Sequence, residues 1–573
     1  ARPAFPRKLS ETGLFASTRD LAPAAGVVPY AINAELWSDG ARADRILAVP
    51  GTGKLAVDSG RLRFPDGSVL ARTVSLELVE GDPRSRRRVE TQILHREAGS
   101  WRPYSYQWDD AQADAALVGP AGANRSFTVR DPGEPGGTRE HAYRFAARSE
   151  CVLCHNPWVE TNNVLYGRQS ASPLATTVDQ LDRGEQLRHL EALGLVDSIP
   201  TANDTRLADP RDPSAPLESR ARAYLQTNCA HCHQIGAGGS ANIVLGARTP
   251  LAKSHALDAS PLQGTFGLKD ARIIAPGEPE RSVLYYRIAK LGAGRMPRVG
   301  SNRVDVLGTR LIADWIASIP RGSSDPVRGA DEVAQVEHAA SPAVRREAIL
   351  RLIRTTGGTL ALVRSIDASS ISESVGHEAA ALARALAAPE VVDLLERFLP
   401  ESERSRRLGD AIDPAAILTR AGDARRGREL FRAGGAAACR SCHRADGDGV
   451  DIGPALDGVG SKYPRADLLA QILDPSRTID PRYATMTIAT RDGQVLSGIV
   501  VEDSPRALIL RDAAGRTTRL APADVEDRRR EPKSLMPDGL LAGLTAAQAV
   551  DLLEYLAGLK SPEPPRGTGT ASP

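Results

Sequence analysis

The chain has few aromatic residues, no spare cysteine and almost no net charge. Phe, Trp and Tyr make up 4% of its 573 residues, which is little for a core of this size. Lys and Arg total 73 against 71 Asp and Glu, so no strong field favours nucleic acid or acidic membranes as partners. No apolar run approaches the roughly 18 residues that span a bilayer. We therefore expect neither a transmembrane segment nor nucleic-acid binding.

All six cysteines belong to three copies of one motif, in which two residues separate the cysteines and a histidine follows directly. Two thiols at this spacing can form thioethers to the heme vinyl groups while the histidine coordinates the iron. A zinc site or a redox dithiol is the alternative, but neither needs a histidine after every pair. The sequence therefore predicts three covalently attached hemes c, whose apolar planes also contribute to the core. The copies are Cys151-Val152-Leu153-Cys154-His155, Cys229-Ala230-His231-Cys232-His233 and Cys439-Arg440-Ser441-Cys442-His443.

Methionines are the natural source of a sixth iron ligand for two of the hemes. Only three exist, and Met296 and Met536 each stand before a proline, downstream of the second and third motifs. A thioether favours ferrous iron and raises the reduction potential relative to a second histidine. Core packing is the alternative for any methionine, and we assign it to Met486, which lies in an alternating strand pattern. The predicted proximal ligands are His155, His233 and His443.

Heme 1 has no such methionine, so a second histidine is the first choice for its sixth ligand. His141, His189 and His95 are the candidates. We prefer His141 slightly, because the end of the β-rich segment that carries it must lie beside Cys151. An open iron is the alternative and would permit peroxide or small-ligand chemistry. The remaining histidines, which have no metal-like spacing and are interpreted as solvated, are His231, His255, His338 and His377.

Short β-prone runs with turn signals characterise the N-terminal segment, as in residues 61–70 and 73–78. They predict a β-sandwich-like domain over residues 1–150, which leads directly into the first motif. We expect heme 1 to sit against this domain, within a segment at 151–215. Residues 179–196 of that segment have the pattern of a helix.

Residues 216–325 have the pattern of a small cytochrome c domain around the second motif. A helix ends at Cys229, a glycine-rich loop follows His233, and an apolar helix around Trp315 closes the unit. Residues 326–420 are almost entirely helical in pattern, with breaks at glycine and proline. They predict two or three short helical hairpins with no chemistry of their own.

Residues 421–560 repeat the cytochrome pattern around the third motif. A helix precedes Cys439, a β insertion is predicted at 484–520, and residues 545–559 form the closing helix. The tail at 561–573 is rich in Pro, Gly and Thr and is expected to be disordered. The predicted fold is multidomain α+β, with a β-sandwich-like domain, two α-helical class I cytochrome c domains, a helical-repeat domain between them and a β insertion in the last.

Short motifs surround the third heme site: Gly422-Asp423, Gly427-Arg428-Glu429-Leu430-Phe431, Gly453-Pro454-Ala455-Leu456, Asp474-Pro475-Ser476, Asp492-Gly493 and Ser534-Leu535-Met536-Pro537. Through them residues 331–560 resemble the heme-binding domain of large cytochromes from planctomycetes and related bacteria. The resemblance implies that Met536 is the sixth ligand. It also implies that the carbonyl of Pro454 holds the proximal His443, a contact that orients and tunes the ligand.

A second set of motifs lies in the N-terminal part: Leu36-Trp37-Ser38-Asp39-Gly40-Ala41, Phe64-Pro65-Asp66-Gly67, Glu90-Thr91-Gln92, Asn228-Cys229 and Pro276-Gly277-Glu278-Pro279. Through them residues 1–320 resemble an uncharacterised bacterial cytochrome family often associated with pyrroloquinoline-quinone sugar dehydrogenases. No Gly-Pro follows the second motif, so no carbonyl can be named that would hold His233. Neither resemblance implies a substrate.

Together these features predict a triheme c-type cytochrome without catalytic residues. It would transfer electrons from a periplasmic donor, such as a pyrroloquinoline-quinone dehydrogenase, to a soluble cytochrome or a membrane redox complex. One alternative is a multiheme peroxidase or oxidase with heme 1 as its catalytic iron, and another is a mainly structural subunit of a larger complex. Bacteria attach heme c outside the cytoplasmic membrane, so a periplasmic or extracellular location is expected. The first residue, Ala1, fits removal of a signal peptide or a shortened chain.

Overall fold

Helices and strands are mixed along the chain, with 35% of residues helical and 24% in strands. This confirms the mixed class, while the order of domains stays a prediction. None of the described helices has both the length and the apolarity that crossing a bilayer requires. The chain falls into two compact units, made of residues 1–259, 272–291 and 296–404 and of residues 260–271, 292–295 and 405–573. The computed structural model describes residues 5–58, 60–119, 122–134, 136–146, 151, 155, 176–181, 185–197, 206–234, 241, 243–261, 264–292, 294–297, 300–321, 330–386, 388–409, 412–432, 439–491, 495–511, 515, 517–530, 534–536 and 539–560.

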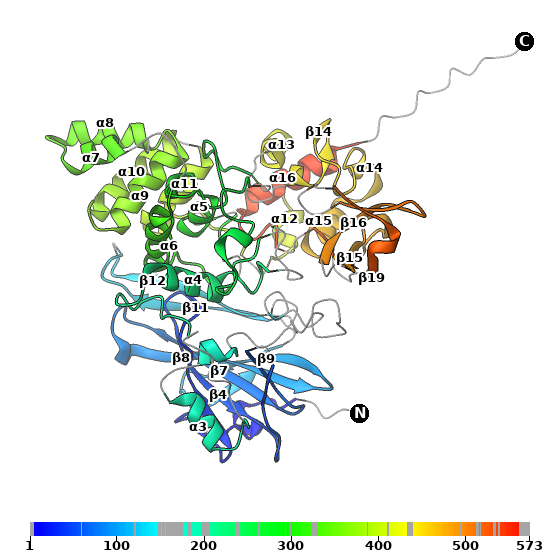
Figure 1. Cartoon of the computed structure of the whole chain (residues 1–573). Coiled ribbons are helices and arrows are strands. Elements are labelled where there is room, and N and C mark those ends of the chain that lie inside the picture. The colour runs from blue at the N-terminus through cyan, green and yellow to red at the C-terminus, as the bar shows by residue number, and fades with distance from the viewer. Residues whose placement is uncertain are drawn as a thin grey trace, which may run out of the picture. The chain divides into compact units, whose positions relative to one another are not determined.

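The N-terminal part of the first unit is built on an antiparallel six-stranded sheet with the order β10-β9-β8-β7-β4-β3 (Figure 1). Val74 and Leu76 of β7 pack with Val89 on one face. Ala71 packs with Ile93 in a separate core cluster on the opposite face, because successive side chains of a strand point to opposite sides. The strands are β3 (Val27–Tyr30), β4 (Arg42–Ala48), β7 (Val69–Glu77), β8 (Arg86–Glu97), β9 (Ser100–Trp108) and β10 (Ala115–Leu117).

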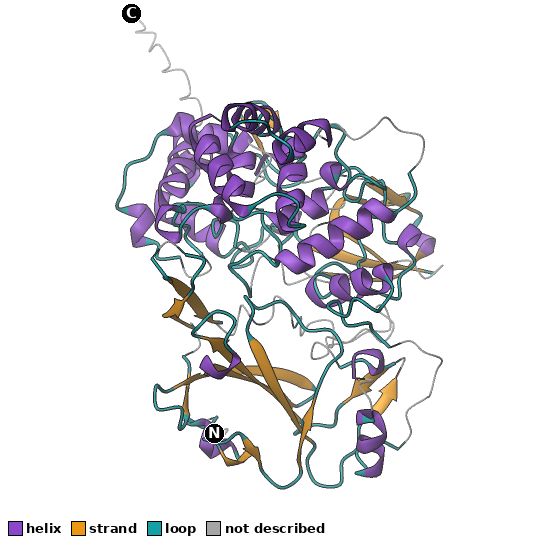
Figure 2. Ribbon diagram, turned by 90° about the vertical axis from the view of Figure 1, so that its left-hand side faces the viewer, coloured by secondary structure: helices purple, strands orange, loops and turns teal. Residues whose placement is uncertain are grey.

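A hairpin of two strands packs on this sheet through Phe127 and Tyr143, which contact the cluster around Val74. Figure 2 shows the strands of this part in orange. The second strand of the hairpin carries His141 and ends shortly before the first cysteine motif, so the chain enters that motif from this hairpin. The paired strands outside the large sheet are β1 (Phe15–Ser17) with β2 (Ala22–Pro23), β5 (Ala56–Asp58) with β6 (Arg61–Arg63), and β11 (Ala123–Arg130) with β12 (Thr138–Phe145).

The helix predicted over residues 179–196 is instead two short helices, α2 (Val178–Leu181) and α3 (Gln186–Ala192). α3 ends early because the amide of Leu195 turns back and donates to the carbonyl of Leu190 (3.0 Å), a bond typical of helix C-termini. Leu190 itself is buried among apolar residues of the β-rich part. Packing against that core therefore determines where the helix stops.

From α4 onward, the described regular structure of the first unit is helical. α4 (Leu217–Asn228) leads into the second motif and contacts α6 (Val306–Ser318), where the ring of Tyr224 occupies the space beside Gly308. Five later helices share one buried apolar core, as the helical pattern of residues 326–420 predicts. The remaining helices are α5 (Val283–Ala289), α7 (Ala330–Glu337), α8 (Pro342–Leu352), α9 (Thr356–Asp367), α10 (Glu373–Leu386) and α11 (Pro389–Leu395).

The second unit contains a five-stranded antiparallel sheet in the order β18-β17-β16-β15-β19. The predicted β insertion at 484–520 is present but longer, because β19 pairs with β15 and carries the sheet to Arg530. Met486 packs against the core cluster of this sheet, which confirms its predicted packing role. The elements are α12 (Ala415–Leu418), α13 (Ala424–Arg432), β13 (Arg444–Ala445), β14 (Asp448–Gly449), α14 (Val459–Lys462), α15 (Arg465–Leu473), β15 (Thr485–Thr490), β16 (Val495–Ser504), β17 (Ala507–Arg511), β18 (Thr517–Leu520), β19 (Val525–Arg530) and α16 (Ala546–Gly558).

The helices α13 and α16, which flank the third motif in sequence, cross closely at Gly427. A Cβ atom at Gly427 would lie 2.0 Å from the carbonyl oxygen of Asp551 and 2.8 Å from Cβ of Tyr555. The buried ring of Phe431 lies 5.5 Å from the ring of Tyr555, centroid to centroid. Arg426 adds an ion pair with Asp551 (2.7 Å). The first and last helices of the predicted cytochrome unit thus pack directly on each other.

Replacing Gly427 by alanine should destabilise the second unit by about 1–3 kcal/mol, the usual cost of overpacking, because the new methyl group forces α13 and α16 apart. Gly558→Ala is the matched control, since no atom lies within 4 Å of a Cβ atom at Gly558. That variant should be neutral, or more stable by about 0.5–1 kcal/mol, because alanine favours a helix over glycine. Guanidinium unfolding followed by circular dichroism measures both. Equal free energies of unfolding for the two variants would contradict the close crossing.

Candidate heme sites

The same backbone hydrogen bond joins the two ends of all three cysteine motifs. In each, the amide of the histidine donates to the carbonyl of the first cysteine, four residues earlier. This bond brings the first cysteine and the histidine onto one side of the chain, as two covalent attachment points and an iron ligand require. Cys154 lies outside the described residues. The three bonds are His155 to Cys151 (3.0 Å), His233 to Cys229 (2.9 Å) and His443 to Cys439 (2.8 Å).

At the third site, Nδ1 of His443 donates to the carbonyl oxygen of Pro454 at 2.7 Å, which confirms the contact that the resemblance implied. A Cβ atom at Gly453 would lie 2.6 Å from Cε1 of His443, so only glycine lets the loop pass this close to the ring. The amide of Gly453 also donates to the carbonyl of Cys442 (2.6 Å). The loop therefore holds the imidazole in one orientation.

At the second site, the pKa of His233 is lowered to about 4, mainly by burial and to a smaller degree by the positive charge of Arg287. Arg287 belongs to α5, and its carbonyl accepts a hydrogen bond from the amide of Met296 (2.9 Å). Arg287 of α5 therefore acts on His233 through its charge and holds the backbone of Met296 through its carbonyl. Nδ1 of His233 is buried without a hydrogen-bond partner in the described part of the chain, in agreement with the lack of a Gly-Pro loop here.

Met536 lies on a short described segment that two hydroxyl groups hold in place. The amide of Met536 donates to Oγ of Ser534 (3.1 Å), and the amide of Ser534 donates to Oγ of Ser476 (3.2 Å). The motif that contains Ser476 and the motif that contains Ser534 and Met536 are therefore in contact, although they lie far apart in sequence. The approach of the Met536 sulfur to the third site stays a prediction.

At the first site, burial lowers the pKa of His155 to about 4, with smaller effects from the charges of His231 and Arg72. His141 is buried in β12, with 5% of its surface exposed. Burial lowers the pKa of His141 as well, and the charges acting on it belong to Asp39, Arg139, Arg303 and Glu80. His189 is exposed on α3, and His95 is half-buried in β8 with its ring 6.1 Å from that of Phe5.

The cysteines of the second and third motifs behave as buried thiols. Burial raises the pKa of Cys229 and of Cys439 to about 12, so both stay protonated near neutral pH. Neither forms a disulfide. Zinc sites and redox dithiols depend on thiolates, which an electropositive setting has to stabilise. In the described residues no three His, Cys, Asp or Glu side chains cluster as a metal site.

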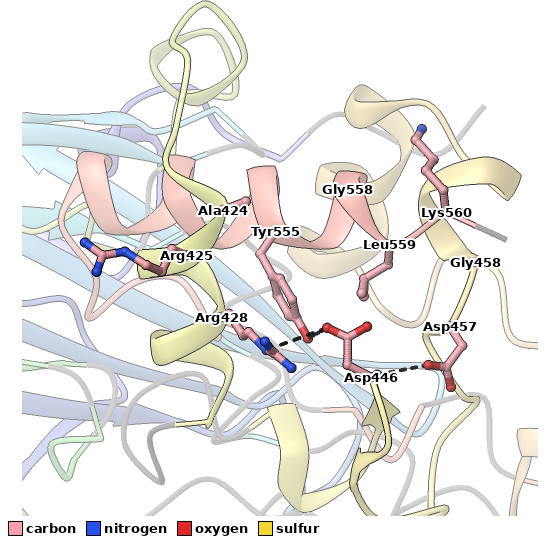
Figure 3. Close-up of a pocket in the computed structure, with 10 residues that line it drawn as sticks. All are labelled: Ala424, Arg425, Arg428, Asp446, Asp457, Gly458, Tyr555, Gly558, Leu559 and Lys560. Carbon is pink, nitrogen blue, oxygen red and sulfur yellow. Dashed lines mark hydrogen bonds and ion pairs between the residues drawn. The ribbon is translucent and has the colours of Figure 1, made fainter. Parts of the chain in front are cut away.

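Two features were not anticipated from sequence. The first is His231, which was interpreted as solvated but has a buried Nδ1 without a hydrogen-bond partner among the described residues. The second is a pocket of about 580 Å³ beside α13 and α16, in which Tyr555 Oη donates to Asp446 (3.2 Å) (Figure 3). No motif signals either feature, because both depend on which distant segments pack together. The pocket is lined by Ala424, Arg425, Arg428, Asp446, Asp457, Gly458, Tyr555, Gly558, Leu559 and Lys560.

Comparison with known families finds a match in the C-terminal part of the chain. The family model for cytochrome c matches residues 424–495, a range that begins with α13 and includes the third motif and Pro454. No curated protein matches the chain. The matched range is a cytochrome c domain, which implies covalently bound heme c, a redox partner and a role in electron transfer. Such domains are commonly extracytoplasmic.

Proposed function

We propose, from the cytochrome c domain at residues 424–495, that the whole chain is a triheme c-type cytochrome. The observation that carries this proposal is the repeated turn: the first cysteine and the histidine adopt the same bonded arrangement in the matched motif and in the other two. Heme c, when bound, supplies a one-electron iron couple whose potential depends on its axial ligands and surroundings. The attachment residues are Cys151 and Cys154, Cys229 and Cys232, and Cys439 and Cys442, with His155, His233 and His443 as proximal ligands.

The role of the proximal histidines follows from their burial. An imidazole binds iron only in its neutral form, and burial lowers the pKa of His155, His233 and His443. Burial therefore favours the neutral form of each ring, the form that can bind iron. At the third site the hydrogen bond to Pro454 also fixes which nitrogen carries the proton, so Nε2 is left to face the iron.

Met296 and Met536 are the proposed sixth ligands of hemes 2 and 3. Ligation by a thioether closes the iron to substrates and stabilises the ferrous state, which suits a carrier of single electrons. The amide of Met296 donates to the carbonyl of Arg287 and the amide of Met536 donates to Oγ of Ser534, so the backbone is held in place at both positions. Little rearrangement would then accompany electron transfer.

The proposed partners follow from the resemblance of the N-terminal part. The electron donor is a periplasmic dehydrogenase of the pyrroloquinoline-quinone type, and the acceptor is a soluble cytochrome or a membrane redox complex. The near balance of 73 basic and 71 acidic residues argues for local docking surfaces rather than one strong overall field. The location that fits these partners is the periplasm or the cell exterior.

An anaerobic reoxidation experiment tests the carrier role against the peroxidase alternative. The chemically reduced holoprotein should transfer its electrons to an oxidised soluble cytochrome c, because closed low-spin irons exchange electrons without binding a substrate. Hydrogen peroxide should reoxidise it much more slowly. Stopped-flow absorbance of the reduced heme bands measures both rates. Fast turnover of peroxide with little transfer to the cytochrome would contradict the proposal and favour an enzyme.

A further inference from the structure

Arg72 of β7 places a guanidinium group between two apolar cores of the β-rich part. Every second side chain of a strand points to the same face, so Arg72 shares its face with Leu70 and Val74, which belong to separate buried clusters. Nε of Arg72 is buried without a hydrogen-bond partner in the described part of the chain. Among the described residues, Arg72 donates to Oγ of Ser38 (3.2 Å) but forms no ion pair. A charge in such surroundings is costly unless an anion compensates it.

The carboxylates whose charges act on Arg72 are those of Glu35 and Glu90, and both are bound by other groups. Arg45, the cross-strand neighbour of Arg72 in β4, donates through Nη1 to Glu35 (2.8 Å). Glu90 of β8 accepts a hydrogen bond from Oη of Tyr143 (2.7 Å). Burial raises the pKa of Glu90, which favours its uncharged form. Neither carboxylate therefore compensates the charge of Arg72.

Ser38, the hydrogen-bond partner of Arg72, belongs to a sequence motif that the proposed function leaves without a role. The amide of the preceding residue, Trp37, donates to Oδ1 of Asn228 (2.9 Å). Asn228 is the last residue of α4 and directly precedes Cys229 of the second heme motif. Two hydrogen bonds and one peptide link thus connect Arg72 to the start of that motif.

The same segment also contacts the strand that leads to the first heme motif. Asn302 donates through its amide to Oδ2 of Asp39 (2.8 Å) and through Nδ2 to the carbonyl of Ala142 in β12 (3.1 Å). Tyr143, the next residue of β12, is the residue that donates to Glu90. β12 ends shortly before Cys151. Arg72 therefore lies where the segments that enter the first and second motifs meet.

We infer that Arg72 holds a propionate carboxylate of heme 1 or heme 2. The inference rests on the proposed triheme function. Heme c carries propionate side chains that are ionised near neutral pH, so it brings to this junction the anion that the described residues lack. A guanidinium can donate two parallel hydrogen bonds to one carboxylate, which orients the carboxylate as well as compensating its charge. Arg72 would thus position the heme edge and keep the propionate ionised.

The test begins with Arg72→Gln in the full-length holoprotein. The reduction potential of one heme should fall, because loss of a nearby positive charge disfavours ferrous iron. That potential should also become pH-dependent between roughly pH 5 and 8, because a buried carboxylate without its cation has a raised pKa. Protonation at low pH removes a negative charge, so the potential should decrease as the pH rises. Spectroelectrochemical titration across this pH range measures both effects.

Two control variants separate the charge of Arg72 from a general effect of substitution. Arg72→Lys keeps the positive charge, so its potentials should stay closer to those of the wild type and vary little with pH. Arg86 is an exposed arginine of β8 that pairs with Glu77 (2.9 Å). Arg86→Gln should leave all potentials unchanged, because solvent and salt screen exposed charges. An equal shift in Arg86→Gln and Arg72→Gln would contradict the inference.

The methionine variants identify which heme supplies the propionate. If Arg72→Gln shifts the potential that Met296→Ala also lowers, the carboxylate belongs to heme 2. If it shifts the potential that neither Met296→Ala nor Met536→Ala changes, the carboxylate belongs to heme 1. A shift confined to the potential that Met536→Ala lowers would overturn the inference, because it would assign the effect to heme 3.

Intact mass separates failure of the inference from failure of the proposed function. Wild-type protein with fewer than three hemes would overturn the function itself. With three hemes attached, unchanged potentials without pH dependence in Arg72→Gln would overturn only the assignment of Arg72. Should Arg72→Gln fail to attach all hemes, Arg72→Lys replaces it. Its redox-difference infrared spectrum should then show a shifted propionate carboxylate band, because an ammonium cannot reproduce the guanidinium fork, and an unshifted band would refute the contact.

Discussion

The intact mass of the mature protein should exceed that of the polypeptide by three hemes c. The reason is that three motifs account for all six cysteines and that each contains the same bonded turn between first cysteine and histidine. The buried thiols of Cys229 and Cys439 stay protonated and form no disulfide, so they remain available for thioether bonds. Mass spectrometry under denaturing conditions counts the hemes, because thioether-linked heme survives unfolding.

Cysteine variants provide the matched controls for this count. Replacing Cys229 and Cys232 together by alanine should remove one heme, and the same change at Cys439 and Cys442 should remove another. Each loss should leave the other hemes attached, because each motif forms its own local turn. A wild-type count of zero or one would contradict the central proposal. A count of two would leave a cytochrome but refute its triheme state.

The second large effect is expected at the methionine ligands. Met296→Ala and Met536→Ala should each lower the reduction potential of one heme and make that heme accessible to carbon monoxide, because the soft sulfur that stabilises ferrous iron is lost. The fall should be a sizeable part of the roughly 0.8 V range that axial ligands span. Spectroelectrochemical titration resolves the three potentials before and after each change.

Met486→Ala is the control within the same set of residues. Met486 packs in the apolar cluster of Ile488, Leu508 and Leu510, so its loss should lower stability but leave all three potentials unchanged. Unchanged potentials in both Met296→Ala and Met536→Ala would show that other residues occupy the sixth positions. A shift in Met486→Ala alone would reverse the assignment of packing and ligation.

Features coded by short stretches of sequence were predicted well. The closing helix expected at 545–559 is α16, and its start is set by a local capping box in which Thr545 and Gln548 bond reciprocally. The proline that holds His443 lies only 11 residues downstream, and its contact is present at 2.7 Å. The packing role of Met486 followed from simple strand alternation. The capping box and the Pro454 contact depend on neighbours near in sequence, and the alternation that marks Met486 as a strand residue is local too.

Features that depend on distant partners were missed. The helix expected at 179–196 is split, since Leu190 packs into the β-rich core and the chain turns back at Leu195. The β insertion runs past residue 520 because β19 pairs with β15, about 40 residues earlier in the chain. Periodicity within a segment contains no information about either contact.

The sequence by itself was enough to predict the heme chemistry, because Cys-x-x-Cys-His needs only one turn of chain to bring thiols and imidazole together, and three copies are visible without any fold. Tertiary structure alone decided the surroundings of each motif. It brought the amide of Met296 to the carbonyl of Arg287. The physical reason is that burial and ligand access are set by packing between segments remote in sequence, and no local spacing records which segments meet.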